Sequence, residues 1–452
     1  MTVAARPPGA TDAPPGGVLP RWGRSAGVPA AAVVAVVLAA AGLIAGRVDL
    51  ALLAVPLVAG VGLSWGRRPD PSAGGSVRLE LGTPRGAEVD FVLSLRPPPG
   101  VEAVVLRQRL LAGEAREVVV SAGPDGILGG TVPLLHSGPQ ELVRVEYRFL
   151  GADAAVVGSP HEPLVAELVV APARAEVRAL PLPWRLQGLT GSHASARAGD
   201  GGDFRDVHRF VPGDRLRRID WKATARRANN AGELYVRRTA ALADATVLLV
   251  LDSRDDVGEQ VAEWSRNAAA TMGVSSLDVA REAAGSLASA YIRAGDRVGF
   301  QDLSSTARMI PHGGGNRHLW RLLRTIETTA PSATPFSRHR PPIVPPGALV
   351  YLLSSLLDDQ AVRLALTWRG SGHRVVAVDV LPAARFARTN RYQRLAHRVL
   401  MMERHDRIGL LQARGVEVLR WPDDGATLPR RVRLQLLSRP SRHGARPAVG
   451  RW

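Results

Sequence analysis

The sequence predicts a multi-domain chain with a transmembrane helical hairpin, then an all-β sandwich-like module, then an α/β domain with a doubly wound sheet. Three observations predict it. Two apolar runs lie near the N-terminus, short alternating runs follow them, and strand-like runs then alternate with helix-like segments. At 452 residues the chain has room for about two or three domains.

Composition narrows the classes of function only slightly. The formal net charge is +17, from 58 Lys+Arg against 41 Asp+Glu, and Lys222 is the only lysine. Such a charge suits nucleic acid or an anionic membrane surface, but the 46 Gly and 34 Pro favour a GC-rich coding bias as its source. The chain has no cysteine, which excludes disulfides, thiolate metal sites and a cysteine nucleophile.

The N-terminal region predicts a tail followed by a membrane anchor. Residues 1–27 are rich in Pro and Gly without periodicity, so we expect a disordered tail. Two apolar runs, 28–46 and 50–65, each approach the length that crosses about 30 Å of hydrocarbon, which predicts a two-helix anchor over 28–66. A cleaved signal peptide is disfavoured because the second run follows at once. A buried pair of soluble helices is disfavoured because such helices keep a polar face.

Flanking arginines predict the orientation of this anchor. The turn between the two runs holds only Arg47, which Asp49 offsets, whereas arginines flank both outer ends. The positive-inside rule therefore places both ends of the anchor, and the large part of the chain after it, in the cytoplasm. The sequence thus predicts a multi-pass protein of the inner or plasma membrane. Trp22 and Trp65 lie where interfacial aromatic residues are expected. The flanking arginines are Arg21, Arg24, Arg67 and Arg68.

Residues 75–183 predict the β module. Apolar and polar residues alternate in short runs that Gly, Pro or Asp separate, a pattern typical of a sandwich of antiparallel strands. We expect a spacer or docking role for it. Four residues in it carry metal-ligand chemistry but lack ligand spacing, and we expect them at the surface: Glu88, Asp90, His136 and His161.

The pattern of residues 244–438 predicts an α/β domain, and residues 439–452 are expected to form a basic tail. The run ATVLLVLD reads as a first strand that Asp252 closes, and 275–295 has helical spacing with Gly295 as its stop signal. Strand-like and helix-like segments then alternate to residue 438, which predicts a mostly parallel sheet with helices on both faces. Sites in such sheets form beyond the carboxyl ends of strands, where the strand order switches. Asp252 therefore lies at a candidate rim.

Residues 184–243 join the two domains and contain a long motif. The sequence HRFVPGDRLRRIDWKATARR is preceded by GDGGDFRD and matches RxxPGDxxRxIDWxxxAR. It resembles the DUF58 family, whose members end in a von Willebrand factor A-like domain, are membrane-anchored and often occur beside a MoxR-type AAA+ ATPase. The resemblance extends to the hairpin and β module, and it implies that ATPase as partner. The motif residues are Arg209, Pro212, Gly213, Asp214, Arg217, Asp220, Trp221, Lys222 and Arg226.

The resemblance also implies a place for a metal ion. Von Willebrand A domains often bind a cation through Asp-x-Ser-x-Ser, and this register holds Asp252, Arg254 and Asp256. Carboxylates suit Mg²⁺, but Arg254 brings a positive charge to the site unless it turns outward. The loop 312–317 lacks the expected threonine, and the strand expected to end in aspartate ends in Ser354-Ser355. The candidate ligands Asp252, Asp256 and Ser355 thus form a degenerate Mg²⁺ site, and we expect no other cofactor.

Two interpretations of the junction motif stay open. Its mixed charges form either an internal ion-pair network that locks the β module to the α/β domain or an exposed docking patch, and we favour the lock because opposite charges satisfy each other. Nucleic-acid binding is not expected, since the aromatic residues there are few and show no stacking pattern. The glycine-rich segment 199–203 is not followed by the Lys-Ser/Thr pair of a phosphate-binding loop, so we expect an exposed loop there.

No catalytic motif stands out, because Gly-x-Ser-x-Gly and His-Glu-x-x-His are both missing. The sequence therefore favours a membrane-anchored scaffold or adaptor, with a cytoplasmic interaction domain that works with a MoxR-type ATPase in the assembly or maturation of other proteins. The alternative is a metal-dependent hydrolase at the Asp252 rim, and an adhesion module on the export side is a third. The oligomeric state stays open.

Overall fold

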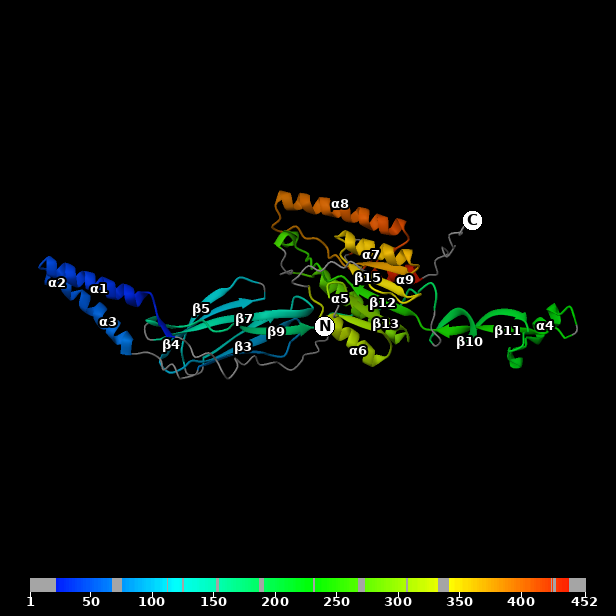
Figure 1. Cartoon of the computed structure of the whole chain (residues 1–452), viewed down its shortest axis with the longest axis horizontal. Coiled ribbons are helices and arrows are strands. Elements are labelled where there is room, and N and C mark those ends of the chain that lie inside the picture. The colour runs from blue at the N-terminus through cyan, green and yellow to red at the C-terminus, as the bar shows by residue number, and fades with distance from the viewer. Residues whose placement is uncertain are drawn as a thin grey trace. The chain divides into compact units, whose positions relative to one another are not determined.

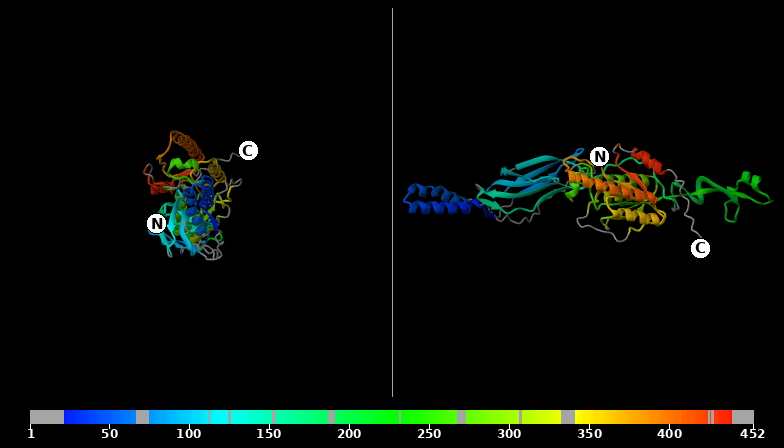
Figure 2. Two further views of the ribbon diagram at one scale, coloured as in Figure 1. Left: turned by 90° about the vertical axis from the view of Figure 1, so that its left-hand side faces the viewer. Right: turned by 90° about the horizontal axis from the view of Figure 1, so that it is seen from above.

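The chain divides into two compact units, which are described one at a time. The first comprises Met1–Leu135 and Pro139–Ala171, and the second His136–Gly138 and Pro172–Trp452. Figures 1 and 2 show the elements along the chain in three views. The computed structural model describes residues 22–66, 75–111, 113–123, 126–151, 154–186, 191–230, 232–266, 273–305, 308–331, 341–423, 425 and 428–438.

The N-terminal apolar region forms three helices, α1 (Gly27–Ile44), α2 (Val48–Leu52) and α3 (Ala54–Gly66). Among the described residues, α1 alone is both long and apolar enough to cross a membrane, and the second apolar helical stretch, Val48–Leu63 in α2 and α3, is shorter. The helices α1 and α3 lie side by side in Figures 1 and 2. Gly42 allows close packing with α2, because a Cβ there would lie 2.6 Å from the backbone nitrogen of Ala51.

A short strand precedes α1, where the sequence predicts a tail. β1 (Trp22–Arg24) pairs antiparallel with β8 (Val156–Gly158), so the expected tail is wrong for these three residues, while 1–21 lie outside the described residues. Trp22 packs against the apolar core of the β module rather than standing free as an interfacial anchor. The strand is too short for a sequence pattern, and its pairing partner lies more than a hundred residues away.

The β module contains two antiparallel sheets. One has the order β2-β3-β6, and the other the order β1-β8-β7-β4-β5 with β9 also paired to β7. Inward residues of both sheets, such as Leu79 and Leu93 from one and Val104 and Val145 from the other, form a single buried cluster. The remaining strands are β2 (Ser76–Leu81), β3 (Glu88–Arg96), β4 (Val101–Leu110), β5 (Arg116–Ser121), β6 (Gly126–Pro133), β7 (Gly138–Gly151) and β9 (Leu164–Val170).

Two histidines expected at the surface are partly buried instead. The His161 ring stacks on Tyr147 with 4.5 Å between ring centroids, and burial lowers its pKa. His136, which belongs to the second unit, lies 2.7 Å through Nδ1 from the Asp278 carboxylate. Exposure of single polar residues in loops depends on tertiary packing, which local alternation does not report. Glu88 is exposed, as expected.

The second unit has a six-stranded sheet of order β14-β13-β12-β15-β16-β17. All neighbours pair parallel except the edge strand β14, which pairs antiparallel with β13. The chain thus alternates strand and helix as the sequence predicts. The strands are β12 (Thr246–Leu251), β13 (Arg297–Asp302), β14 (Met309–Gly313), β15 (Leu349–Ser354), β16 (Arg374–Asp379) and β17 (Glu417–Arg420).

Helices cover both faces of this sheet. Alternate residues of β12 enter different cores: Leu249 packs with α5, α6 and α9, whereas Leu248 packs with α7 and α8. A capping box at Ser275 and Asp278 starts α5, and Gly295 follows its end with φ +87°. The helices are α5 (Ser276–Arg293), α6 (Asn316–Glu327), α7 (Asp359–Gly370), α8 (Arg391–Ala413) and α9 (Arg430–Ser438).

The junction region forms a two-stranded arm. β10 (His193–Arg209) pairs antiparallel with β11 (Tyr235–Ala243), with register shifts where β10 has surplus residues. Residues 199–203 fall within the bounds of β10, but Gly199 and Phe204 both pair with Thr239, so the residues between them form a bulge in the strand where the sequence predicts a loop. At the base, His193 Nε2 lies 3.0 Å from the buried Asp296 carboxylate. Figure 1 shows α4 (Trp221–Arg227) near the other end of the arm.

Candidate functional site

The first candidate site is the rim where the strand order reverses. β12 pairs with β13 on one side and with β15 on the other, so the switch point lies between β12 and β15. Asp252 follows β12 and Ser354 ends β15, which brings their side chains together. The Ser354 hydroxyl donates a 2.8 Å hydrogen bond to Asp252 Oδ2 and accepts one of 3.1 Å from the Leu356 amide.

The backbone beside Ser354 is in an uncommon conformation. Leu356 has φ +57°, the left-handed region that a branched side chain rarely adopts, and its side chain is fully buried. Such a residue stores about 1–3 kcal/mol of strain, which the surrounding packing has to offset. The bond from its amide to Ser354 therefore fixes a strained turn between β15 and α7 against the rim.

Arg254 lies across the rim and holds its carboxylates. The guanidinium donates to both Asp252 oxygens, from Nε at 2.7 Å and from Nη2 at 2.8 Å, and Nη1 lies 2.6 Å from Asp358 Oδ2. Nη1 also donates to Gln360 Oε1 at 2.5 Å. The Arg254 side chain is only 13% exposed. It turns inward, where the sequence left open whether it turns outward.

Electrostatics at the rim follow from this arrangement. Burial by itself lowers the pKa of Arg254, but the hydrogen bonds and charges of Asp252 and Asp358 outweigh it and raise the pKa above its ordinary value. Burial and the Asp252 charge raise the pKa of Asp255. A fixed cation thus already neutralises the carboxylates that a divalent metal would use.

The predicted metal ligands do not converge. Asp256 Oδ1 accepts a 3.1 Å hydrogen bond from the Leu277 amide, so Asp256 serves the N-terminus of α5. The Ser355 carbonyl accepts a 2.9 Å bond from Arg404 Nε of α8. Within the described part of the chain, no group of three or more His, Cys, Asp or Glu side chains is arranged to hold a metal ion. Of the three candidates, Asp252 and Ser355 follow the carboxyl ends of β12 and β15, whereas Asp256 lies at the start of α5.

The second candidate site is the motif at the tip of the arm. The Pro212-Gly213-Asp214 turn forms as expected, with φ +107° at Gly213 and a 3.0 Å bond from the Val211 amide to Asp214 Oδ2. Asp220 is the N-cap of α4 and accepts a 2.9 Å bond from the Ala223 amide.

The tip is held together by its own residues. Arg209 Nη2 lies 2.8 Å from Glu233 Oε1, and Thr224 Oγ1 accepts a 3.0 Å bond from the Tyr235 amide. These contacts join residues of the arm to one another. The hypothesis of an internal lock instead expects ion pairs between the β module and the α/β domain. The three tip carboxylates each have a partner within the arm: Asp214, Asp220 and Glu233.

Cations and apolar side chains remain exposed at this tip. Trp221 is 68% exposed, and Val211 and Leu216 are exposed as well. Among the described residues, no carboxylate lies within ion-pair distance of four exposed cations there. These cations are Arg217, Lys222, Arg226 and Arg227.

Comparison with known families bears on this second site. Residues 206–385 match the family model described as Protein of unknown function DUF58. Residues 206–385 belong to DUF58. The DUF58 segment includes the arm tip, β11 and the Asp252 rim, and it confirms the resemblance seen in the motif while covering less than half of the chain. No curated protein and no solved structure matches the chain.

The sequence misses the arm and the partners of Arg254. Neither strand of the arm has a clear sequence signal: β11 has three consecutive polar residues in place of alternation, and β10 is polar and glycine-rich. Asp358 and Gln360 lie more than a hundred residues from Arg254, and only the parallel pairing of β12 with β15 brings them close.

Proposed function

We propose that the chain is a membrane-anchored docking protein that holds a partner protein at the tip of its β10–β11 arm. The observation that carries this proposal is the exposed Trp221 among cations that lack carboxylate partners in the described residues. An aromatic anchor with a basic surround is a common hot-spot composition at protein interfaces. Since the tip's own carboxylates are already engaged, its cations are available to acidic groups of a partner.

The partner that the family resemblance implies is a MoxR-type AAA+ ATPase. The chain would act as its scaffold or adaptor in the assembly or maturation of other proteins. The alternative, a metal-dependent hydrolase at the Asp252 rim, is not proposed, because the Arg254 guanidinium bonds both oxygens of the Asp252 carboxylate.

Capture of partner proteins by the full chain in detergent tests the proposed role of the arm. The chain should retain a MoxR-type ATPase in an ATP-dependent manner, and Trp221→Ala should reduce retention by about tenfold, a typical loss for an aromatic hot spot. Trp320→Ala is the matched control, because Trp320 is 71% exposed on α6 of the same unit. Equal retention by both variants, or no AAA+ ATPase identified by mass spectrometry, contradicts the proposal.

The α/β domain is proposed to be von Willebrand A-like. Numbered along the domain, its strands have the order 3-2-1-4-5-6 with an antiparallel third strand at the edge, which supports this proposal. The order is shared with other doubly wound folds. Superposition of an experimental structure on von Willebrand A domains tests the assignment, and a different strand order there would reject it.

The anchor is proposed to be a two-helix hairpin with both ends in the cytoplasm. In support, β1 before α1 and β2 after α3 belong to one β module, so the chain has to return to the side from which it left. The flanking arginines support the cytoplasmic side. A C-terminal alkaline phosphatase fusion should therefore be inactive and a C-terminal fluorescent fusion bright. The reverse pattern would reject this orientation, and a fusion at Arg47 is the control for the far side.

A further inference from the structure

The outward face of α8 carries apolar side chains in contact with solvent. Leu395 is 59% exposed and Met402 64% exposed, and Val399 between them is exposed as well. Their spacing of four and three residues places them on one stripe of the helix. A continuous exposed apolar stripe of this kind marks an interaction site more often than single exposed residues do.

The inward face of α8 is covered only in part. Of its 23 residues, Arg404 and Leu411 alone are buried. The other inward residues, including His397 and Met401, are half-buried. A helix with apolar residues on both faces is normally covered on both.

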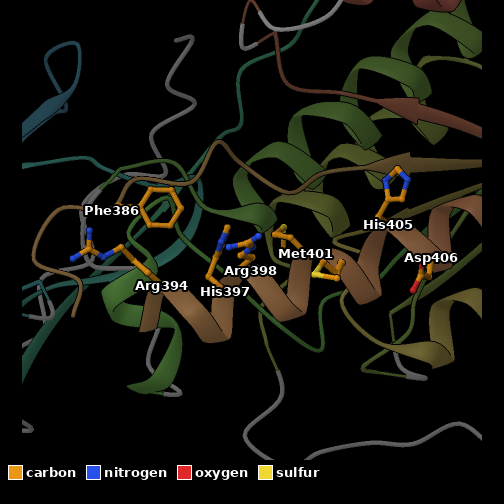
Figure 3. Close-up of a pocket in the computed structure, with 8 residues that line it drawn as sticks. Phe386, Arg394, His397, Arg398, Met401, His405 and Asp406 are labelled. Atoms are coloured by element: carbon orange, nitrogen blue, oxygen red, sulfur yellow. The ribbon is translucent and has the colours of Figure 1, made fainter. Parts of the chain in front are cut away.

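A hollow of about 810 Å³ lies along α8. Figure 3 shows the side chains that line it, with Phe386 from the preceding loop near the N-terminal turns of the helix. The Phe386 and His397 rings meet edge-on, with centroids 5.0 Å apart. Met401 and Met402 line the hollow, and their flexible thioether side chains can adapt to an incoming apolar group.

The charge around the hollow is one-sided. From Arg391 to Met402 the helix carries three arginines and no acidic residue. Arg394 and Arg398 line the hollow and are exposed, and no carboxylate of the described residues lies within ion-pair distance of either. Among the described residues that line the hollow, Asp406 is the acidic one, and it lies at the far end. An occupant with carboxylates opposite Arg394 and Arg398 would complement this surface.

We propose that this α8 surface binds an acidic amphipathic helix of another protein, with apolar residues against Met402 and Phe386 and carboxylates against Arg394 and Arg398. The chain's three longest undescribed segments are poor occupants, because 1–21, 332–340 and 439–452 contain a single acidic residue, Asp12. A hollow suits a helix that inserts side chains better than it suits a flat lipid surface. The proposal is independent of the arm tip.

The test uses the full chain in a neutral phosphatidylcholine nanodisc and a fluorescent helical peptide with leucine on one face and glutamate on the other. Anisotropy should report saturable binding at about 1–100 μM, and a scrambled peptide of the same composition should bind about tenfold more weakly. Arg394→Glu combined with Arg398→Glu should weaken binding by about tenfold or more. The matched control is Arg317→Glu with Arg321→Glu on α6, which makes the same change in charge at exposed positions and should bind as the unchanged chain does.

Several results would overturn this proposal. They are no binding up to about 1 mM, equal binding of the scrambled peptide, or an equal loss in both double variants. If the peptide fails but the α8 variant alone loses attachment to anionic vesicles, the occupant is lipid. If it loses self-association in size-exclusion chromatography instead, the occupant is a second copy. An unchanged thermal midpoint in both variants shows that folding is intact, and ATPase retention through the arm should be unaffected in both.

Discussion

Replacing Arg254 with methionine should lower the free energy of unfolding of the α/β domain by about 3 kcal/mol. The substitution leaves the Asp252 carboxylate, only 8% exposed, without the guanidinium that pairs both of its oxygens. Removing one partner of a buried ion pair is costly because the other charge stays buried. For a domain of this size the thermal midpoint should fall by about 6–12 °C. Fluorescence- or calorimetry-detected unfolding of the full chain in detergent measures it.

The same variant distinguishes a tethered cation from a metal site. Mg²⁺ should not raise the midpoint of the unchanged chain, because Arg254 already bonds Asp252 and Asp358. It should partly restore the midpoint of Arg254→Met, where two carboxylates face each other without a counter-charge. Arg321→Met is the matched control on an exposed arginine and should shift stability by less than about 0.5 kcal/mol. Stoichiometric Mg²⁺ binding by the unchanged chain in calorimetry would refute the tethered-cation interpretation.

Local signals predict the α/β architecture well because each element carries its own chemistry. The run from Val247 to Leu251 is apolar throughout, as a strand buried on both faces requires. Ser275 and Asp278 cap α5, and Gly295 ends it. These features act over a few residues, so periodicity and capping rules are sufficient to locate them.

Elements that depend on distant pairing are the ones the sequence does not reveal. β1 is three residues long and acquires its conformation from β8. β10 has glycines, charges and register shifts, so no alternation marks it as a strand before β11 is placed against it. The arm tip is missed for the same reason. A sequence with mixed charges is equally consistent with an interface between two domains and with a tip whose carboxylates pair within the arm.

The rim is predicted in position but not in chemistry. Asp252 lies at the switch point because it closes the first strand of a doubly wound sheet. The direction of Arg254 depends on Asp358 and Gln360, which follow the partner strand β15. Asp256 lies four residues after Asp252 and accepts a hydrogen bond from the Leu277 amide at the start of α5 instead. Finding suitable residue types at the spacing of a metal-binding motif therefore does not establish that they bind one metal ion together.

Replacing Arg404 with leucine should lower the free energy of unfolding by about 2–3 kcal/mol and loosen α8. Arg404 reaches inward from α8 to the carboxyl ends of two strands, with Nε bonded to the Ser355 carbonyl at 2.9 Å and Nη2 paired with Asp379 at 2.5 Å. The expected loss is smaller than for Arg254, because Arg420 Nη1 remains 3.0 Å from Asp379. Hydrogen exchange of the α8 amides should become faster, since few other side chains of this helix are buried.

Arg394→Leu on the same helix is the control for this prediction. Arg394 is exposed, so its loss should leave the thermal midpoint and the exchange rates of α8 nearly unchanged while weakening peptide binding at the α8 surface. Arg404→Leu should reduce both stability and binding, because the helix that presents the surface is no longer fixed to Asp379 and Ser355. If Arg404→Leu leaves α8 exchange unchanged, then Arg404 does not hold the helix to the rim. In that case the partial burial of α8 reflects packing through Leu411 and its neighbours alone.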